Sequence, residues 1–187
     1  MNIIERIKNI LINPKTEWDV IDQEEETLNN ILVKYVLIVA LIPAIAAAIG
    51  YSNFSIEVMG QKISTNVSSL SIFLKNYVTS IISFYICTYV VDALAINFNS
   101  EKNINKSAQL VAYSFTASWL AGIFSIIPML LFLSIAGLYS IYLFYIGLPK
   151  LKKTPEDKIV PYMIVSALVI IAINLVIGYA LGKMIIF

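Results

Sequence analysis

The sequence predicts an all-α integral membrane protein: a bundle of five transmembrane helices preceded by an amphipathic interfacial segment. Of its 187 residues, 59% are hydrophobic and only 13% are charged, and the mean hydropathy is +0.81, which lies outside the range of soluble domains. Uncharged apolar stretches of about 20 residues recur along the chain. Such stretches cross lipid only as helices, because hydrocarbon offers backbone polar groups no partner.

Residues 1–30 are predicted to form a cytoplasmic amphipathic segment. Apolar residues recur there at helical spacing, namely Ile3, Ile7, Ile10 and Leu11. The other side is polar, with Glu5, Arg6, Lys8 and Asn9. Pro14 ends this helix, and Trp18 gives a second short helix an aromatic anchor at headgroup depth. Pro14 and Trp18 are therefore candidate interfacial anchors. The segment either seats the bundle on the membrane or offers a docking surface to a partner.

Residues 31–187 form the predicted membrane domain. Its five spans lie near residues 35–51, 77–98, 108–127, 129–148 and 159–181. The third and fourth spans belong to one uncharged run, which is too long for a single crossing, and Pro128 supplies its turn signal. We therefore expect a tight helical hairpin at Pro128. The loop of residues 52–76 between the first two spans reads equally well as a hairpin or as an irregular segment.

The distribution of Lys and Arg predicts the orientation of the five spans. Ten of the 13 basic residues fall before the first span, between the second and third spans, or between the fourth and fifth. The remaining three are Lys62, Lys75 and Lys183. Because short cytoplasmic loops carry the excess of basic residues, the N-terminus is expected in the cytoplasm and the C-terminus outside.

Small residues at four-residue spacing predict close packing between helices of the bundle. Ala40, Ala44 and Ala48 form one stripe in the first span, and Gly178 with Gly182 forms a GxxxG pattern in the fifth. Both patterns allow helix backbones to approach closely. They favour packing within the bundle over a dimer.

The residue inventory argues against catalysis and against nucleic-acid binding. The chain has no His and a single Cys, so it lacks imidazole for metal ligation and cannot form an internal disulfide. No nucleophile, base and orienting group can be assembled, so we expect no enzyme, no metal site and no cofactor. A net charge of +1 gives no nucleic-acid footprint. Cys87, inside an apolar run, is interpreted as a small buried hydrophobe.

Asp92 is the one carboxylate within the apolar run of the second span, about 9 Å along the axis from its cytoplasmic end. Four other polar side chains are expected in the same layer, namely Tyr113, Tyr142, Tyr162 and Lys158. An unpaired charge inside the bilayer costs about 2.5 to 3.5 kcal/mol on insertion scales. We hypothesise that Asp92 bonds to Tyr113 or Tyr142, with Lys158 favouring its ionised form. The cluster then acts as polar glue between helices, as a proton or ion relay, or toward a partner.

The chain resembles the bacterial branch of the Yip family, the Yip-one-domain proteins whose eukaryotic members interact with Ypt/Rab small GTPases. The similar stretches are "NPKTEWDVI", "VVDALAINF", "EKNINKSAQLVAYSFTASWLAGIFSIIP" and "GLYSIYLFYIGLPKLKKTPEDK". The resemblance implies a five-span bundle with a cytoplasmic N-terminus. The family features carried over are Pro14, Trp18, the Asp92 to Ala95 segment, Tyr113, Trp119, Pro128, the Tyr139 to Tyr142 stretch, Gly147, Pro149 and Lys158.

This sequence departs from the family pattern in ways that bear on partners. Relatives often have Pro after the Leu-Ala pair and a Gly pair after Phe98, where this chain has Ile96 and Asn99-Ser100, and Pro161 is unusual. The "DLYGP" motif of the eukaryotic branch is absent. Rab GTPase binding is therefore not expected.

Two functional classes remain. The first is a non-enzymatic membrane adaptor or organiser with a role in membrane organisation or trafficking-like processes, located in the bacterial cytoplasmic (inner) membrane. Its partners would be the lipid bilayer and a membrane protein or a second copy of the chain. The second is a small ion or solute transporter or channel that uses Asp92. One intramembrane charge is a weak signature of transport, which favours the first class.

Overall fold

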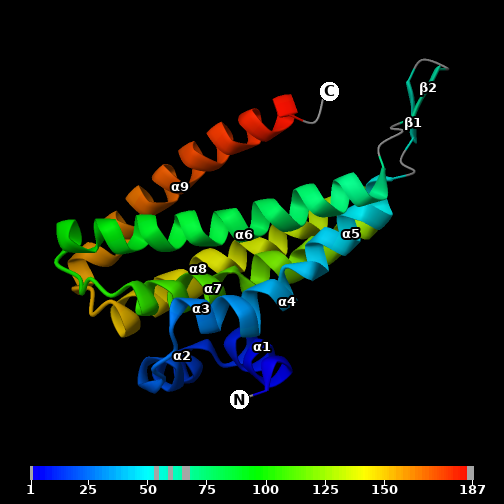
Figure 1. Cartoon of the computed structure of the whole chain (residues 1–187). Helices are drawn as coiled ribbons and strands as arrows, with labels where there is room; N and C mark the ends of the chain where they lie inside the picture. The colour runs from blue at the N-terminus through cyan, green and yellow to red at the C-terminus, as the bar shows by residue number, and fades with distance from the viewer. Residues whose placement is uncertain (1, 53–54, 59–60, 65–67, 185–187) are drawn as a thin grey trace.

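The computed structural model describes residues 2–52, 55–58, 61–64 and 68–184, with the side-chain surroundings of the strands, Asn174 and residues 177–184 left out (Figure 1). The first half contains α1 (Ile3–Ile12), α2 (Pro14–Gln23), α3 (Leu28–Ile31), η1 (Leu32–Val36), α4 (Leu37–Val39), α5 (Leu41–Tyr51), β1 (Ser55–Val58) and β2 (Gln61–Ser64). The second half contains α6 (Ser69–Leu94), η2 (Ala95–Phe98), α7 (Ile104–Ala121), η3 (Gly122–Ile126), η4 (Pro128–Leu138), α8 (Tyr139–Leu151) and α9 (Glu156–Met184).

Four helical stretches in the described residues are long and apolar enough to cross a membrane. They are Leu28–Tyr51, Ser69–Phe98, Ile104–Ile126 and Pro128–Leu151, and they correspond to the first four predicted spans. The chain is thus an integral membrane protein. The fifth prediction, residues 159–181, falls on α9, which forms a helix, but the surroundings of its last residues lie outside the described side chains. A fifth crossing therefore stays a prediction.

The hairpin predicted at Pro128 is confirmed. Ile127 has extended backbone angles, as the residue before proline prefers, and η3 and η4 on its two sides pack together. The helix type differs from expectation, because both η3 and η4 are 3-10 helices. Hydroxyls join the two arms: Ser118 Oγ donates to the carbonyl of Gly137 at 3.0 Å, and Ser118 N donates to Ser140 Oγ at 3.0 Å.

Of the two alternatives predicted between the first two spans, a hairpin or an irregular segment, the described residues form the hairpin. β1 and β2 form an antiparallel hairpin in which Ile56 pairs with Ile63. α6 then begins at Ser69, before the predicted start near residue 77. Lys75 marked that boundary in the sequence, yet a helix can continue beyond the hydrocarbon core, where a charge is solvated.

The N-terminal helices α1 and α2 form a unit that we call the N-terminal platform (residues 3–23). It lies beneath α3 and α7, near the end of the bundle at which α7 begins (Figure 1), and we call that end the platform end. Ile10, Trp18 and Ile21 are fully buried in the core shared with the bundle. The other members of the predicted apolar stripe, Ile3, Ile7 and Leu11, pack against this core, so the stripe faces protein. Ile4, which is not part of the stripe, is 71% exposed.

Two glycines that sequence reasoning passed over set the closest helix approaches. A Cβ atom added to Gly50 would lie 1.8 Å from the carbonyl oxygen of Ser125, and one added to Gly122 would lie 2.6 Å from Pro43 Cβ. α5 can therefore approach η3 only because glycine stands at both positions. Of the predicted alanine stripe, Ala40 and Ala44 are fully buried. Gly178 and Gly182 lie in α9, but their surroundings are outside the described residues.

Candidate functional site

The centre of the candidate site is a buried ion pair between Asp92 on α6 and Lys152 after α8. Lys152 Nζ lies 3.1 Å from Asp92 Oδ1, and the side chain of Lys152 is 0% exposed, that of Asp92 10%. The hydroxyl of Ser107 on α7 lies 3.1 Å from the same carboxylate oxygen. Asp92 therefore has the partners that a carboxylate in an apolar span requires.

The Lys152 ammonium is fully hydrogen-bonded. Its three donors match three acceptors: Asp92 Oδ1 at 3.1 Å, Ser107 Oγ at 2.7 Å and the Asn103 carbonyl oxygen at 3.3 Å. Burial lowers the pKa of Lys152 from its usual value, whereas the hydrogen bond and the charge of Asp92 raise that pKa. The geometry supports the charged pair because every donor of the ammonium has an acceptor.

Local backbone signals explain how Lys152 reaches this position. The side chain of Asn103 caps α7 by accepting from the backbone N–H groups of Asn105 and Lys106, and the Asn103 carbonyl faces Lys152. Lys153 has a positive φ of 50°, so the chain turns sharply after α8. The N–H of Glu101 donates to the carbonyl of Lys152 at 2.8 Å, which holds the two loops together.

Further hydrogen bonds at the same end of the bundle hold α9 and the loop that precedes it. Ser100 Oγ donates to Thr154 Oγ1 at 2.9 Å, and the Tyr162 hydroxyl donates to the carbonyl of Val91. The ring of Tyr162 stacks on Phe98 with centroids 4.8 Å apart. The ion pair and these ties connect α6, α7, α8 and α9 at one level.

The structure brings together some of the predicted residues and separates others. Tyr162 lies near Asp92, as expected, because its hydroxyl bonds to the adjacent Val91. The hypothesis that Asp92 bonds to Tyr113 or Tyr142 is wrong, since its hydroxyl partner is Ser107.

The prediction that Lys158 is the cation beside Asp92 is also wrong. Lys158 pairs with Asp157 at 3.6 Å and its side chain is 42% exposed, while Lys152 takes the buried place. The sequence has three lysines within four residues after the fourth span, at positions 150, 152 and 153. Lys150 and Lys153 pair instead with Asp19 and Asp22 of the N-terminal platform.

Tyr113 and Tyr142 lie elsewhere for separate reasons. Tyr113 faces the N-terminal platform, where its ring meets Trp18 and Tyr35 edge-on at centroid distances of 6.3 and 4.8 Å. Tyr142 is 42% exposed and its ring lies beside Tyr139. Depth along a helix, on which the expectation rested, gives no information on which side of that helix faces Asp92.

A second buried charge cluster holds the N-terminal platform. Arg6, 5% exposed, donates to Glu17 at 2.5 Å and also to Glu24, and its guanidinium lies 5.2 Å from the centre of the Tyr113 ring. From the sequence, Arg6 is expected on the polar side of the first helix. Arg6 follows Ile3 by three residues and precedes Ile10 by four, so helical periodicity places it beside the apolar stripe instead. This spacing is the signal in the sequence that indicates its burial.

Side chains of the bundle also capture the helix ends of the N-terminal platform. Lys106 Nζ donates to the carbonyl of Asp22 at 2.5 Å, and Gln109 Nε2 donates to that of Glu24 at 3.1 Å. The hydroxyl of Tyr139 donates to the carbonyl of Leu11 at 3.1 Å. These bonds satisfy carbonyl groups that the ends of α1 and α2 leave open.

The predicted anchors Pro14 and Trp18 are buried within protein. Trp18 is 0% exposed and packs on Gly147, where an added Cβ would lie 2.8 Å from the indole ring. Its contacts in this fold are therefore to α7 and α8 and not to headgroups.

The polar side chains described above form hydrogen bonds and ion pairs between helices. Among the described residues, no three His, Cys, Asp or Glu side chains gather as a metal site requires. Cys87 is fully buried, as predicted. The Asp92–Lys152 pair joins α6 to the end of α8, and the Arg6 cluster joins α1 to α2 and contacts Tyr113 on α7, which suits a role in holding the platform end together.

Comparison with known families gives one match. The model of the Yip1 domain matches residues 8–178, which takes in the N-terminal platform from Lys8 onward, the four candidate spans and most of α9. No curated protein and no solved structure gives a significant match. Since the match extends over most of the sequence and includes both charge clusters except Arg6, the chain belongs to the Yip1 domain family.

Proposed function

We propose that this Yip1 domain protein is a non-enzymatic membrane adaptor or organiser that docks a partner protein on its N-terminal platform. The observation that carries the proposal is the construction of the platform. The buried Arg6–Glu17 ion pair joins α1 to α2, and a shared apolar core fixes both helices to the bundle, yet their outer face remains exposed. A rigid surface loses little conformational entropy on binding, which favours affinity.

The outer face of α1 has the composition of a docking surface. Ile4 and Ile12 are 71% and 64% exposed, and the exposed Lys8 lies between them at four-residue spacing. Positions 4, 8 and 12 lie on one face of the helix, and exposed apolar side chains on one helix face are typical of helix-mediated recognition. Lipid contact is the alternative use of the same face, and the first experiment distinguishes the two.

The docking proposal predicts a specific loss on changing the outer face. Ile4→Ser with Ile12→Ser should remove a co-purifying protein from native membranes, because both side chains project away from the core. Ile96→Ser, at an equally exposed position on η2 (63% exposed), is the matched control and should retain the partner. The measurement is quantitative mass spectrometry after mild solubilisation and cross-linking. A wild-type chain without a stoichiometric partner, or one whose platform is instead labelled by lipid probes, would contradict docking.

We assign Asp92 a structural role, in preference to the transport alternative. Its charge is matched by Lys152 within the fold, so the pair carries no net charge to relay. Protein reconstituted in liposomes should give no proton or cation flux above that of empty liposomes. A wild-type flux that Asp92→Asn abolishes while stability is retained would favour transport over the adaptor.

We further propose five crossings, with the N-terminal platform in the cytoplasm and the C-terminus outside, in a bacterial inner membrane. Single cysteines in a Cys87→Ala background test this topology at Lys8→Cys, Ser68→Cys and Glu156→Cys, all at exposed positions, and at a cysteine appended after Phe187. An impermeant maleimide added to intact cells should label Ser68→Cys and the appended cysteine. The other two positions should react only after the membrane is opened. Labelling of Glu156→Cys and the appended cysteine from one side would exclude a fifth crossing.

A further inference from the structure

A large lateral cleft lies between α9 and the rest of the bundle. Its volume is about 740 Å³, within the range of roughly 300 to 1,000 Å³ that small-molecule sites occupy. The walls come from α6, α7, η4, α8 and α9, and Figure 1 shows α9 leaving the bundle at an angle. The cleft is therefore bounded by apolar helices of the membrane domain, and a ligand would reach it from the lipid.

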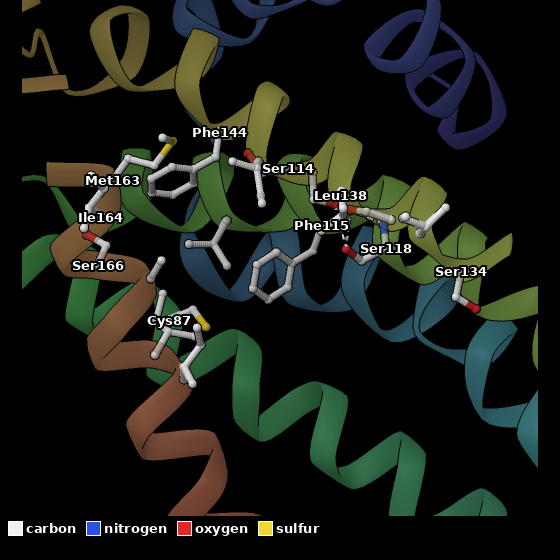
Figure 2. Close-up of a pocket in the computed structure, with 18 residues that line it drawn as sticks. Cys87, Ser114, Phe115, Ser118, Ser134, Leu138, Phe144, Met163, Ile164 and Ser166 are labelled. Carbon is white, nitrogen blue, oxygen red and sulfur yellow. Dashed lines mark hydrogen bonds between the residues drawn. The ribbon is translucent and has the colours of Figure 1, made fainter. Parts of the chain in front are cut away.

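The lining of the cleft defines the chemistry of an occupant. Apolar side chains dominate, among them Phe115, Phe144 and Met163 (Figure 2). None of the described residues that line it is charged. A lipid with a charged headgroup would lose its hydration there without gaining a counter-ion, so the walls select an uncharged molecule.

Two hydroxyls in the cleft wall lack partners in the part of the chain that the structure describes. Ser114 on α7 and Ser166 on α9 are each 1% exposed, and neither Oγ atom has a hydrogen-bond partner among the described residues. Each lies ten residues into its helix from the platform end, so both stand about 15 Å deep. Buried polar groups are usually satisfied, and a purely hydrocarbon chain would leave both unsatisfied.

We propose that this cleft binds an uncharged lipid that carries hydroxyl or ester oxygens on an apolar body, of which diacylglycerol is the simplest example. The acyl chains lie against the aromatic and aliphatic walls and extend into the bilayer. The oxygens of the glycerol and ester groups bond to Ser114 and Ser166. This site is separate from the N-terminal platform and does not depend on the proposed docking function.

Photo-crosslinking of the full chain in lipid nanodiscs tests the site. One probe is diacylglycerol with a diazirine in an acyl chain, and the other is phosphatidylglycerol with identical chains. Peptides are mapped by mass spectrometry, with Phe132, which is 68% exposed outside the cleft, as an internal reference for ordinary lipid contact. The diacylglycerol probe should label the segments around Phe144 and Met163 several times more than the charged probe, while both label Phe132 alike.

Variants then separate the cleft from the general lipid surface. Ser114→Ala with Ser166→Ala should lower cleft labelling about tenfold, since each hydroxyl contributes one hydrogen bond of ordinary strength. Because neither hydroxyl has a partner within the described chain, the double variant should remain folded, and a thermal unfolding scan checks this. Ser80→Ala, on α6 and outside the cleft, is the matched control and should label as wild type.

A steric variant provides an independent readout. Ala167→Trp places an indole in the cleft from an exposed position on α9 and should abolish cleft labelling. Leu168→Trp, one residue on and outside the lining, should leave it intact. Equal labelling of the cleft by both probes, or labelling that survives both the serine and the Ala167→Trp changes, would overturn the proposal.

Discussion

Asp92→Leu is expected to lower the free energy of unfolding by about 3 to 5 kcal/mol, the usual cost of removing one member of a buried ion pair. The cost arises because Lys152, 0% exposed, would keep its charge without a counter-ion. Lys152→Met should cost a similar amount by leaving Asp92 unpaired. Asp92→Asn should cost less, because an amide oxygen still accepts hydrogen bonds from Lys152 and Ser107. The measurement is reversible denaturant unfolding in detergent or bicelles.

A double-mutant cycle and a surface lysine control this prediction. The double variant Asp92→Leu with Lys152→Met removes both charges, so it should recover most of the stability that either single variant loses. Lys158→Met removes an exposed lysine whose partner is Asp157 and should change stability by less than about 0.5 kcal/mol. Equal losses from Lys158→Met and Lys152→Met would show that the buried pair is not the one described.

Trp18→Ala is expected to release the N-terminal platform from the bundle. Replacing a fully buried Trp by Ala costs about 3 to 5 kcal/mol, and the indole of Trp18 packs α2 against Tyr113 on α7 and Gly147 on α8. The destabilisation should therefore appear as local opening, with the spanning helices still folded. The measurements are trypsin cleavage at Lys8 and Lys15 and hydrogen exchange of α1 and α2, both of which should accelerate.

Two further variants show whether packing is the cause. Trp18→Phe keeps an aromatic ring and removes an indole N–H that has no partner among the described residues, so it should cost less than about 1.5 kcal/mol. Val20→Ala alters the outer side of α2, where Val20 is 45% exposed, and should leave cleavage unchanged. If wild-type cleavage already becomes fast when lipid is replaced by detergent, the platform is held by lipid and not by the bundle.

Several features of this fold could be read from the sequence because they depend on local composition. The first four spans follow from apolar length, since a helix is the only structure that satisfies an isolated segment's backbone in hydrocarbon. The turn at Pro128 follows from the missing N–H and fixed φ of proline. The burial of Cys87 and the need of Asp92 for a partner follow from the same apolar context.

Other features depend on how the helices are rotated and joined, and local composition does not contain that information. An apolar stripe such as that of α1 is the same whether it faces lipid or protein, so only the fold decides that Ile10 and Trp18 are in the core. Arg6 is buried because Glu17 and Glu24 return to it.

The sequence by itself determined the class of this protein, its first four helical stretches and the presence of a paired carboxylate. Only the tertiary structure decided which cation pairs with Asp92. Lys152 and Lys158 are near the same helix ends, and both lie within reach of the layer of Asp92 by depth alone. Lys152 is the C-cap residue of α8, and its side chain lies inside the bundle, where Asn103 and Ser107 supply its remaining acceptors. A buried ammonium is stable only where all its donors find acceptors, and those acceptors come from helices that meet only in the folded chain.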